Sequence, residues 1–132
     1  MIGLDTNVVL RLLLTDDPAQ KIRASKFIQQ AKRLDTRVII TLAVVLEMEW
    51  VLRSSAKMNK AEVLNIFNLL LESYDIEIDN EKVLEQALHI YENAASDFAE
   101  CLFLAQYQRM GCSTMMTFDA KAARMADVDL VV

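Results

Sequence analysis

Several carboxylates stand where the local sequence pattern suggests chemistry as well as solubility. Asp5, Asp97 and Asp119 each precede a predicted helix, and Asp5 and Asp119 also follow a predicted strand. Asp is a favoured N-cap, so each could simply satisfy free backbone N–H groups, and Asp97 with Glu100 fits a variant of the capping box. In an open parallel sheet, however, the carboxyl ends of the strands share one edge where ligands bind. We therefore expect Asp5 and Asp119 to be near neighbours at that edge.

The predicted helix that begins after Thr41 carries two further glutamates, Glu47 and Glu49. Only one of them can face a given pocket, because residues two apart point to different sides of a helix. Glu49 has Arg53 one turn ahead, in the favourable order, and we expect an exposed, solvated ion pair. Glu47 has apolar residues three and four positions away, a face on which an unpaired carboxylate is costly unless something binds it. This asymmetry favours Glu47 as the site residue.

Converging carboxylates with no nearby cation repel one another, so their pKa values would rise unless a metal ion lay among them. Oxygen ligands of this kind select Mg²⁺ or Mn²⁺ over Zn²⁺. Such a site suits phosphodiester hydrolysis, in which the metal activates a water molecule and neutralises charge on the phosphate. Thr6, Asn7 and Thr117 are short polar residues that could orient ligands or water, although capping explains them equally well.

Short apolar runs alternate with helical patterns along the chain. Strands are predicted at residues 2–4, 37–40, 75–78, 113–117 and 128–132. Helices are predicted at residues 8–13, 18–34, 42–54, 60–71, 80–94, 97–110 and 119–126, with Gly111 suited to a helix C′ position. No hairpin signal separates the strands. The pattern predicts an α/β fold, with a central, mainly parallel five-stranded sheet flanked by helices on both faces, in a single domain of residues 1–132.

The composition is that of a folded domain, with 54% hydrophobic residues and only two Gly and one Pro in 132. No apolar run is long enough to span a membrane and no leader pattern is visible, so we expect a cytoplasmic protein. Cys101 and Cys112 are isolated and are expected to be reduced thiols. His89 is the only histidine and no nucleophile-elbow motif accompanies it, which argues against Ser-His-Asp or Cys-His catalysis.

The net charge of −5 argues against binding of nucleic acid by bulk electrostatics. The charge is uneven, because residues 1–60 hold ten Lys and Arg against six Asp and Glu, whereas residues 61–132 hold four against thirteen. Seven basic residues could form a local basic face beside an acidic one, although solvated helix faces account for them as well. They are Arg11, Lys21, Arg23, Lys26, Lys32, Arg33 and Arg37.

Four segments carry a resemblance to PIN-domain ribonucleases, and specifically to the VapC-type toxins of bacterial and archaeal toxin–antitoxin pairs. Residues 1–8 resemble the opening strand with the first catalytic Asp, here Asp5, and residues 44–52 resemble the helix with the second acid, here Glu47. Residues 97–105 resemble the "Asp-Phe-Ala-Asp" helix start, and residues 111–119 the final strand and last acid. The resemblance covers essentially the whole chain, and four segments in this order make a specific signal.

The chain departs from the family pattern at Glu100, where the family usually has Asp. The extra methylene keeps the charge but moves the carboxylate by roughly 1 Å, enough to matter in a metal site. Either Asp97 supplies the ligand instead, or Glu100 reaches it with a changed rotamer.

The resemblance implies a Mg²⁺- or Mn²⁺-dependent endoribonuclease that cuts single-stranded or loop RNA, with tRNA, rRNA or mRNA among known family targets. It also implies a homodimer, and an antitoxin protein whose C-terminal segment lies across the acidic pocket. The implied catalytic residues are Asp5, Glu47, Asp97, Glu100 and Asp119, with Asp5, Asp97, Glu100 and Asp119 as metal ligands and Thr6, Asn7 and Thr117 in support. The predicted helices 42–54 and 60–71 are apolar over more than one stripe, which is consistent with a partner surface, although burial of both helices would also explain it.

Two other functions are compatible with parts of the pattern. A non-catalytic PIN-like module, in which Glu100 reflects lost metal binding, would act by association with RNA or protein alone. An aspartate-phosphorylating α/β protein, such as a receiver domain or a haloacid-dehalogenase-like phosphatase, is less favoured. Asp5-Thr-Asn7 lacks the second Asp of the phosphatase motif, and only Lys121 is remotely placed as the lysine of a receiver.

Overall fold

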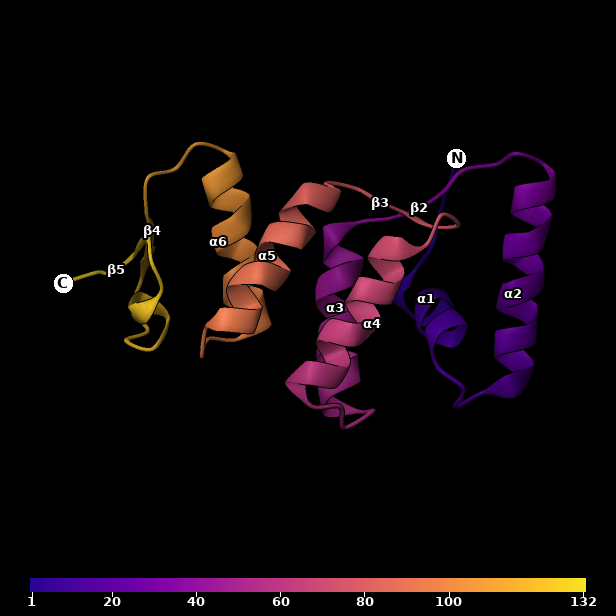
Figure 1. The fold of residues 1–132 in the computed structure, drawn as a ribbon, viewed down its shortest axis with the longest axis horizontal. Coiled ribbons are helices and arrows are strands. Elements are labelled where there is room, and N and C mark those ends of the chain that lie inside the picture. Colours follow the sequence, from indigo (N-terminus) through magenta and orange to yellow (C-terminus); the bar gives the residue numbers. More distant parts are fainter. The chain divides into compact units, whose positions relative to one another are not determined.

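The computed structural model describes all of residues 1–132, which form two compact units, Met1–Asp79 and Asn80–Val132. Six α-helices and five short strands follow one another along the chain, and Figure 1 labels all of the α-helices and strands β2 to β5. Every strand pairing is parallel, as expected when helices separate successive strands. No helix has both the length and the apolar character needed to cross a membrane.

The first unit is a three-stranded parallel sheet with four helices. The sheet has the order β1-β2-β3, from β1 (Ile2–Gly3), β2 (Val38–Ile40) and β3 (Glu77–Ile78). The helices are α1 (Thr6–Leu13), α2 (Pro18–Arg33), α3 (Leu42–Ser54) and α4 (Lys60–Glu72), in which α1 packs against α2 and α3, and α3 packs against α4. The largest side chains of its core are almost fully buried: Val9, Leu10, Ile40, Val45, Met48, Leu52, Val63, Phe67 and Leu70.

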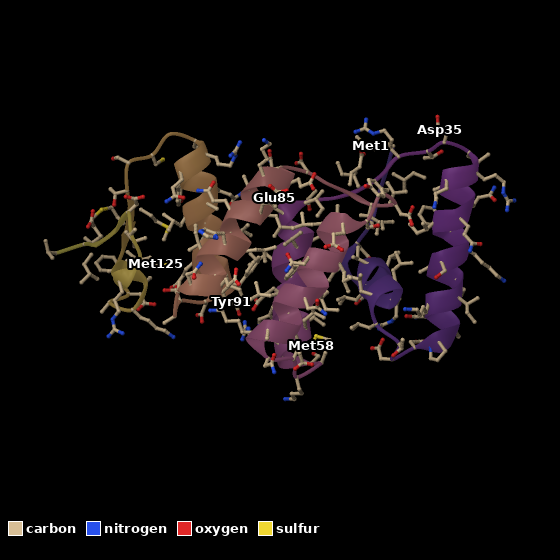
Figure 2. The ribbon with its side chains drawn as sticks, viewed as in Figure 1. Met1, Asp35, Met58, Glu85, Tyr91 and Met125 are labelled. Carbon is tan, nitrogen blue, oxygen red and sulfur yellow. The ribbon has the colours of Figure 1, made fainter.

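Local signals in the sequence account for the helix boundaries of this unit. The Thr41 hydroxyl accepts a hydrogen bond from the Val44 N–H at 3.3 Å, so Thr41 caps α3, which begins where the sequence predicted. Asn59 and Glu62 form a complete capping box at the start of α4. Figure 2 labels Met58 in the turn between α3 and α4, and Asp35 in the turn after α2, where Asp35 adopts the left-handed φ of 52°.

The second unit joins a helix pair to a two-stranded parallel sheet. Helices α5 (Glu81–Asn93) and α6 (Phe98–Arg109) pack together, and the rings of Tyr91 and Phe98 meet edge to face with centroids 5.5 Å apart. Strand β4 (Met115–Thr117) pairs with β5 (Val128–Leu130), and the 3-10 helix η1 (Ala122–Arg124) lies between them in sequence. Gly111 follows the C-cap of α6 with φ of 94°, which confirms its predicted C′ position.

The predicted order of strands and helices is confirmed, and so is the α/β class with parallel strands. The predicted helix at residues 119–126 is shorter than expected, because only residues 122–124 form a helical turn, of the 3-10 type. The five strands divide between a sheet of three and a sheet of two. A single five-stranded sheet, and a single domain over residues 1–132, therefore stay predictions.

Candidate active site

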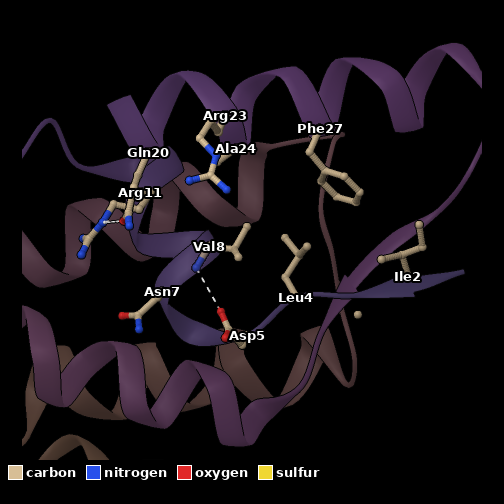
Figure 3. Close-up of a pocket in the computed structure, with 11 residues that line it drawn as sticks. Ile2, Leu4, Asp5, Asn7, Val8, Arg11, Gln20, Arg23, Ala24 and Phe27 are labelled. Atoms are coloured by element: carbon tan, nitrogen blue, oxygen red, sulfur yellow. Dashed lines mark hydrogen bonds between the residues drawn. The ribbon is translucent and has the colours of Figure 1, made fainter. Parts of the chain in front are cut away.

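Asp5 lies where β1 leads into α1, as the sequence predicted. Its Oδ1 accepts a hydrogen bond from the Val8 N–H at 3.1 Å, which caps α1, while the side chain stays exposed (Figure 3). Thr6 is buried at the first position of the helix, and Asn7 is exposed beside it. The capping interpretation is therefore right for Asp5, but a cap uses one lone pair of a carboxylate and leaves the others for a ligand.

The two glutamates of α3 are placed the other way round from our expectation. Glu49 is buried, with 2% of its surface exposed, and Arg53 Nε donates to its Oε1 at 2.7 Å. The prediction of a solvated Glu49–Arg53 pair is wrong, because Glu49 falls in register with Val45 and Leu52 on the buried stripe of α3. Glu47 is exposed, and its face of the helix also exposes Trp50. Glu47 remains the α3 carboxylate that can reach a ligand.

The second unit brings three predicted site carboxylates into one electrostatic group. Glu100, in the first turn of α6, shares a hydrogen bond with the Asp119 carboxylate. The negative charge of Asp97 also raises the pKa of Glu100. Asp97 is the N-cap residue of α6 by position, but its side chain makes no cap hydrogen bond. Only half of the predicted capping box is therefore present, in which the Asp97 N–H bonds to Glu100, and the exposed Asp97 carboxylate is left for another role.

Asp119 is held by backbone groups of the loop that follows β4. The Thr117 hydroxyl accepts a hydrogen bond from the Asp119 N–H at 3.0 Å, and Asp119 Oδ1 accepts one from the Lys121 N–H at 2.8 Å. These two contacts fix both the backbone and the carboxylate of Asp119. Thr117 thus holds the backbone of this loop, and its role in orienting a ligand or water stays a prediction. Lys121 supplies its backbone amide, a contribution that side-chain chemistry alone could not reveal.

The pKa values of the two carboxyl groups in this pair shift in opposite directions. Burial raises the pKa of Glu100, and the Asp119 carboxylate raises it further. The Lys121 N–H lowers the pKa of Asp119, and the hydrogen bond with Glu100 lowers it too. A proton on the pair is therefore held on Glu100, with Asp119 ionised as its acceptor.

The Glu100–Asp119 pair has the donor chemistry that a hard divalent cation needs. Glu100 Oε2 is buried and accepts no hydrogen bond from the protein. A buried polar atom without a partner is costly, and a cation bonded to it would remove that cost. Within either unit, no three His, Cys, Asp or Glu side chains lie close enough together to hold a metal ion. The pair fits a divalent metal, but it supplies only part of a complete ligand set.

A family model for the PIN domain matches residues 2–128, nearly the whole chain. The chain belongs to the PIN-domain family. No curated protein matches it significantly. PIN domains are generally nucleases and typically use divalent metals, which supports a nuclease role for this PIN domain. Its acids at residues 5, 47, 97, 100 and 119 all lie within the matched range.

The raised pKa of Glu100 predicts an unusual pH dependence for the metal-free PIN domain. The folded state binds this proton more tightly than the unfolded chain, so stability falls as pH rises from the ordinary Glu pKa of 4.5 through the raised pKa. The lowered pKa of Asp119 acts in another window, because its stabilising effect is lost only as pH falls below the ordinary Asp pKa of 3.8. Urea unfolding with a chelator, at a series of pH values, measures both effects.

Glu100→Gln should abolish the loss of stability above the ordinary Glu range, because Gln does not titrate. Added Mn²⁺ should reverse that loss in the wild type, since the cation binds the ionised pair of the folded state. An identical pH profile in wild type and Glu100→Gln would contradict the assignment of the proton to Glu100.

Proposed function

We propose that this PIN domain is a Mg²⁺- or Mn²⁺-dependent endoribonuclease that hydrolyses phosphodiester bonds of RNA. The observation that carries the proposal is the buried, unpartnered Glu100 Oε2 beside Asp119, in a chain that belongs to a nuclease family. Neutral side chains would serve a purely structural role at lower cost, because without a cation the two carboxylates must either bind a proton between them or repel each other. We propose the catalytic set Asp5, Glu47, Asp97, Glu100 and Asp119.

In this proposal Glu100 and Asp119 hold the metal, with Asp97 of the same unit as a further ligand. The metal, when bound, would activate a water molecule and neutralise charge on the scissile phosphate. Thr117 and the Lys121 N–H keep the Asp119 carboxylate in place, so little reorganisation is needed on binding. The Asp97 N–H stabilises the ionised form of Glu100, the form that binds a cation.

Separate substitutions of the two candidate ligands on α6 test the proposal. Glu100→Gln should weaken Mn²⁺ binding by at least about tenfold and reduce RNA cleavage in parallel, because it removes the charge of the buried oxygen. If Glu100 is the ligand, Asp97→Asn should weaken Mn²⁺ binding and RNA cleavage less than Glu100→Gln does. If Asp97 is the ligand instead, Asp97→Asn should weaken them more. Calorimetric Mn²⁺ titration and cleavage of single-stranded RNA and DNA provide the measurements.

Glu85→Gln is the matched control for these variants. It makes the same chemical change at an exposed position of α5, so both metal affinity and cleavage should stay within twofold of wild type. Equal Mn²⁺ affinity in wild type and Glu100→Gln would refute the metal assignment. Mn²⁺ binding without RNA cleavage would instead identify the chain as a non-catalytic, PIN-like binding module.

We further propose that this PIN domain is a VapC-type toxin, a cytoplasmic homodimer restrained by a cognate antitoxin. The resemblance of its acidic segments to those toxins supports this, as do exposed apolar side chains on α3 and α4. Trp50 on α3 is 59% exposed and Leu69 on α4 is 51% exposed, which is consistent with a partner surface. A small neighbouring reading frame that encodes a DNA-binding domain would support the toxin assignment, and its absence would favour a solitary nuclease.

A further inference from the structure

The first unit contains a cavity of about 560 Å³ beside Asp5. It lies between β1, α1 and α2, and all of its lining residues belong to the first 27 positions of the chain. Figure 3 shows the side chains of Leu4 and Phe27 facing each other across this space, with Asp5 at the start of α1. The volume is within the range of cavities that bind small molecules or single nucleotides.

The walls of the cavity combine an apolar surface with a polar rim. Leu4 is buried, and Val8 and Phe27 are partly buried, so they provide an apolar wall with one aromatic ring. Asn7 and Arg23 are exposed and bring hydrogen-bond donors to the same space. This composition matches a ligand that is both flat and apolar in one part and polar or charged in another.

The two arginines of the cavity differ in their partners. Arg11 is engaged, because its Nε donates to Gln20 Oε1 at 2.7 Å and its Nη1 lies 3.2 Å from Asp16 Oδ2. Arg23 has no hydrogen bond or ion pair within the protein, and it reaches from α2 toward Val8 (Figure 3). A guanidinium that is not neutralised by the protein is suited to bind a phosphate, often through two parallel hydrogen bonds.

Arg23 and Phe27 are four residues apart on α2, so they lie one above the other on the same face of the helix. A nucleotide offers the two matching groups, since its phosphate is anionic and its base has a flat π surface that stacks on aromatic rings. We propose that this cavity binds one nucleotide of the RNA substrate, with the phosphate on Arg23 and the base against Phe27. The site rests on the proposed ribonuclease function and would hold the strand beside Asp5.

RNA binding by a cleavage-deficient form of the full chain tests this site. Asp119→Asn provides that background, because Asp119 belongs to the other unit and does not line the cavity. In the Asp119→Asn background, Arg23→Gln should weaken binding of a short single-stranded RNA roughly tenfold at low salt. It should also lower the slope of log affinity against log salt concentration by about one. Fluorescence anisotropy of labelled RNA gives both values.

Arg33→Gln is the matched control, since Arg33 is an exposed arginine of the same helix outside the cavity. It should leave the RNA affinity within about twofold of the background protein. Equal RNA affinities of the Arg23→Gln and Arg33→Gln proteins would overturn the nucleotide site and would favour a protein segment as the occupant of the cavity.

A second substitution separates base stacking from structural effects. Phe27→Leu should weaken binding of ordinary RNA about fivefold but leave binding of an abasic ribose-phosphate strand unchanged, because only the base is lost from contact. Equal weakening for both strands would overturn the stacking role. Tighter binding of free AMP than of RNA would overturn the assignment to an RNA substrate.

Cleavage by the wild-type chain, measured in parallel, distinguishes the two possible failures. RNA cleavage together with unaltered binding in Arg23→Gln would overturn the nucleotide site alone. If the wild type neither cleaves nor binds RNA at any Mn²⁺ concentration, the proposed function fails, and the nucleotide site fails with it.

Discussion

Replacing Asp5 with Asn is expected to reduce metal-dependent RNA cleavage by roughly 100-fold or more, with little effect on the fold. The side chain has two roles that this substitution separates. Asp5 Oδ1 caps α1 by accepting the Val8 N–H at 3.1 Å, and the amide oxygen of Asn can accept the same hydrogen bond. Only the negative charge is lost. The free energy of unfolding should therefore change by less than about 0.5 kcal/mol.

Asp17→Asn is a closely matched control for this prediction. Asp17 caps α2 as Asp5 caps α1, with its Oδ1 accepting the Gln20 N–H at 3.1 Å, but no site segment contains it. Its substitution should preserve both cleavage and stability. The measurement is cleavage of single-stranded RNA across a Mn²⁺ titration, with urea unfolding of each variant. Equal cleavage by wild type and Asp5→Asn would rule out a catalytic role for Asp5.

Much of the fold was predictable because its signals are local. Thr41 and Asn59 mark the helix starts, and Gly111 marks a helix end, since each satisfies backbone groups within a few residues of itself. The positions of Asp5 and Asp119 after strands followed from the same local signals. The pairing of strands across the chain was less predictable, because strands of two or three residues carry few side chains that specify a partner.

Side-chain environments depended on contacts that the sequence does not display. Glu100 and Asp119 are 19 positions apart, and their shared proton follows from burial and from the backbone amide of Lys121. The free guanidinium of Arg23 was equally hidden, because solvated helix faces accounted for the basic residues of α2 as well as a binding role did. A distinguishing signal was present in the four-residue spacing of Arg23 and Phe27.

The prediction of a solvated Glu49–Arg53 pair was wrong because of the length of the arginine side chain. An i,i+4 glutamate–arginine pair is typical of a solvated helix face. However, the aliphatic part of a long arginine side chain can cover a buried carboxylate while the guanidinium stays in solvent. Glu49 is 3% exposed in its side chain, whereas Arg53 is 48% exposed. The pair is therefore unequal, and its two members should respond differently to substitution.

Arg53→Met is expected to lower the free energy of unfolding by about 2–3 kcal/mol, because it leaves the buried Glu49 carboxylate without its ion-pair partner. Loss of a partner from a fully buried pair costs more, but water can reach the Arg53 side. Glu49→Met should cost less than about 1 kcal/mol, since Arg53 can turn to solvent and Met packs beside Val45 and Leu52. The double variant should therefore regain most of the stability that Arg53→Met alone loses.

Urea unfolding of the two single variants and the double variant measures this asymmetry, with Glu47→Gln as the control. Glu47 is exposed, so its substitution should change stability by less than about 0.5 kcal/mol. Equal, small losses in the free energy of unfolding for Arg53→Met and Glu49→Met would mean that water solvates the pair. In that case burial would no longer separate the two glutamates, and the choice of Glu47 as the catalytic acid of α3 would rest on the family resemblance alone.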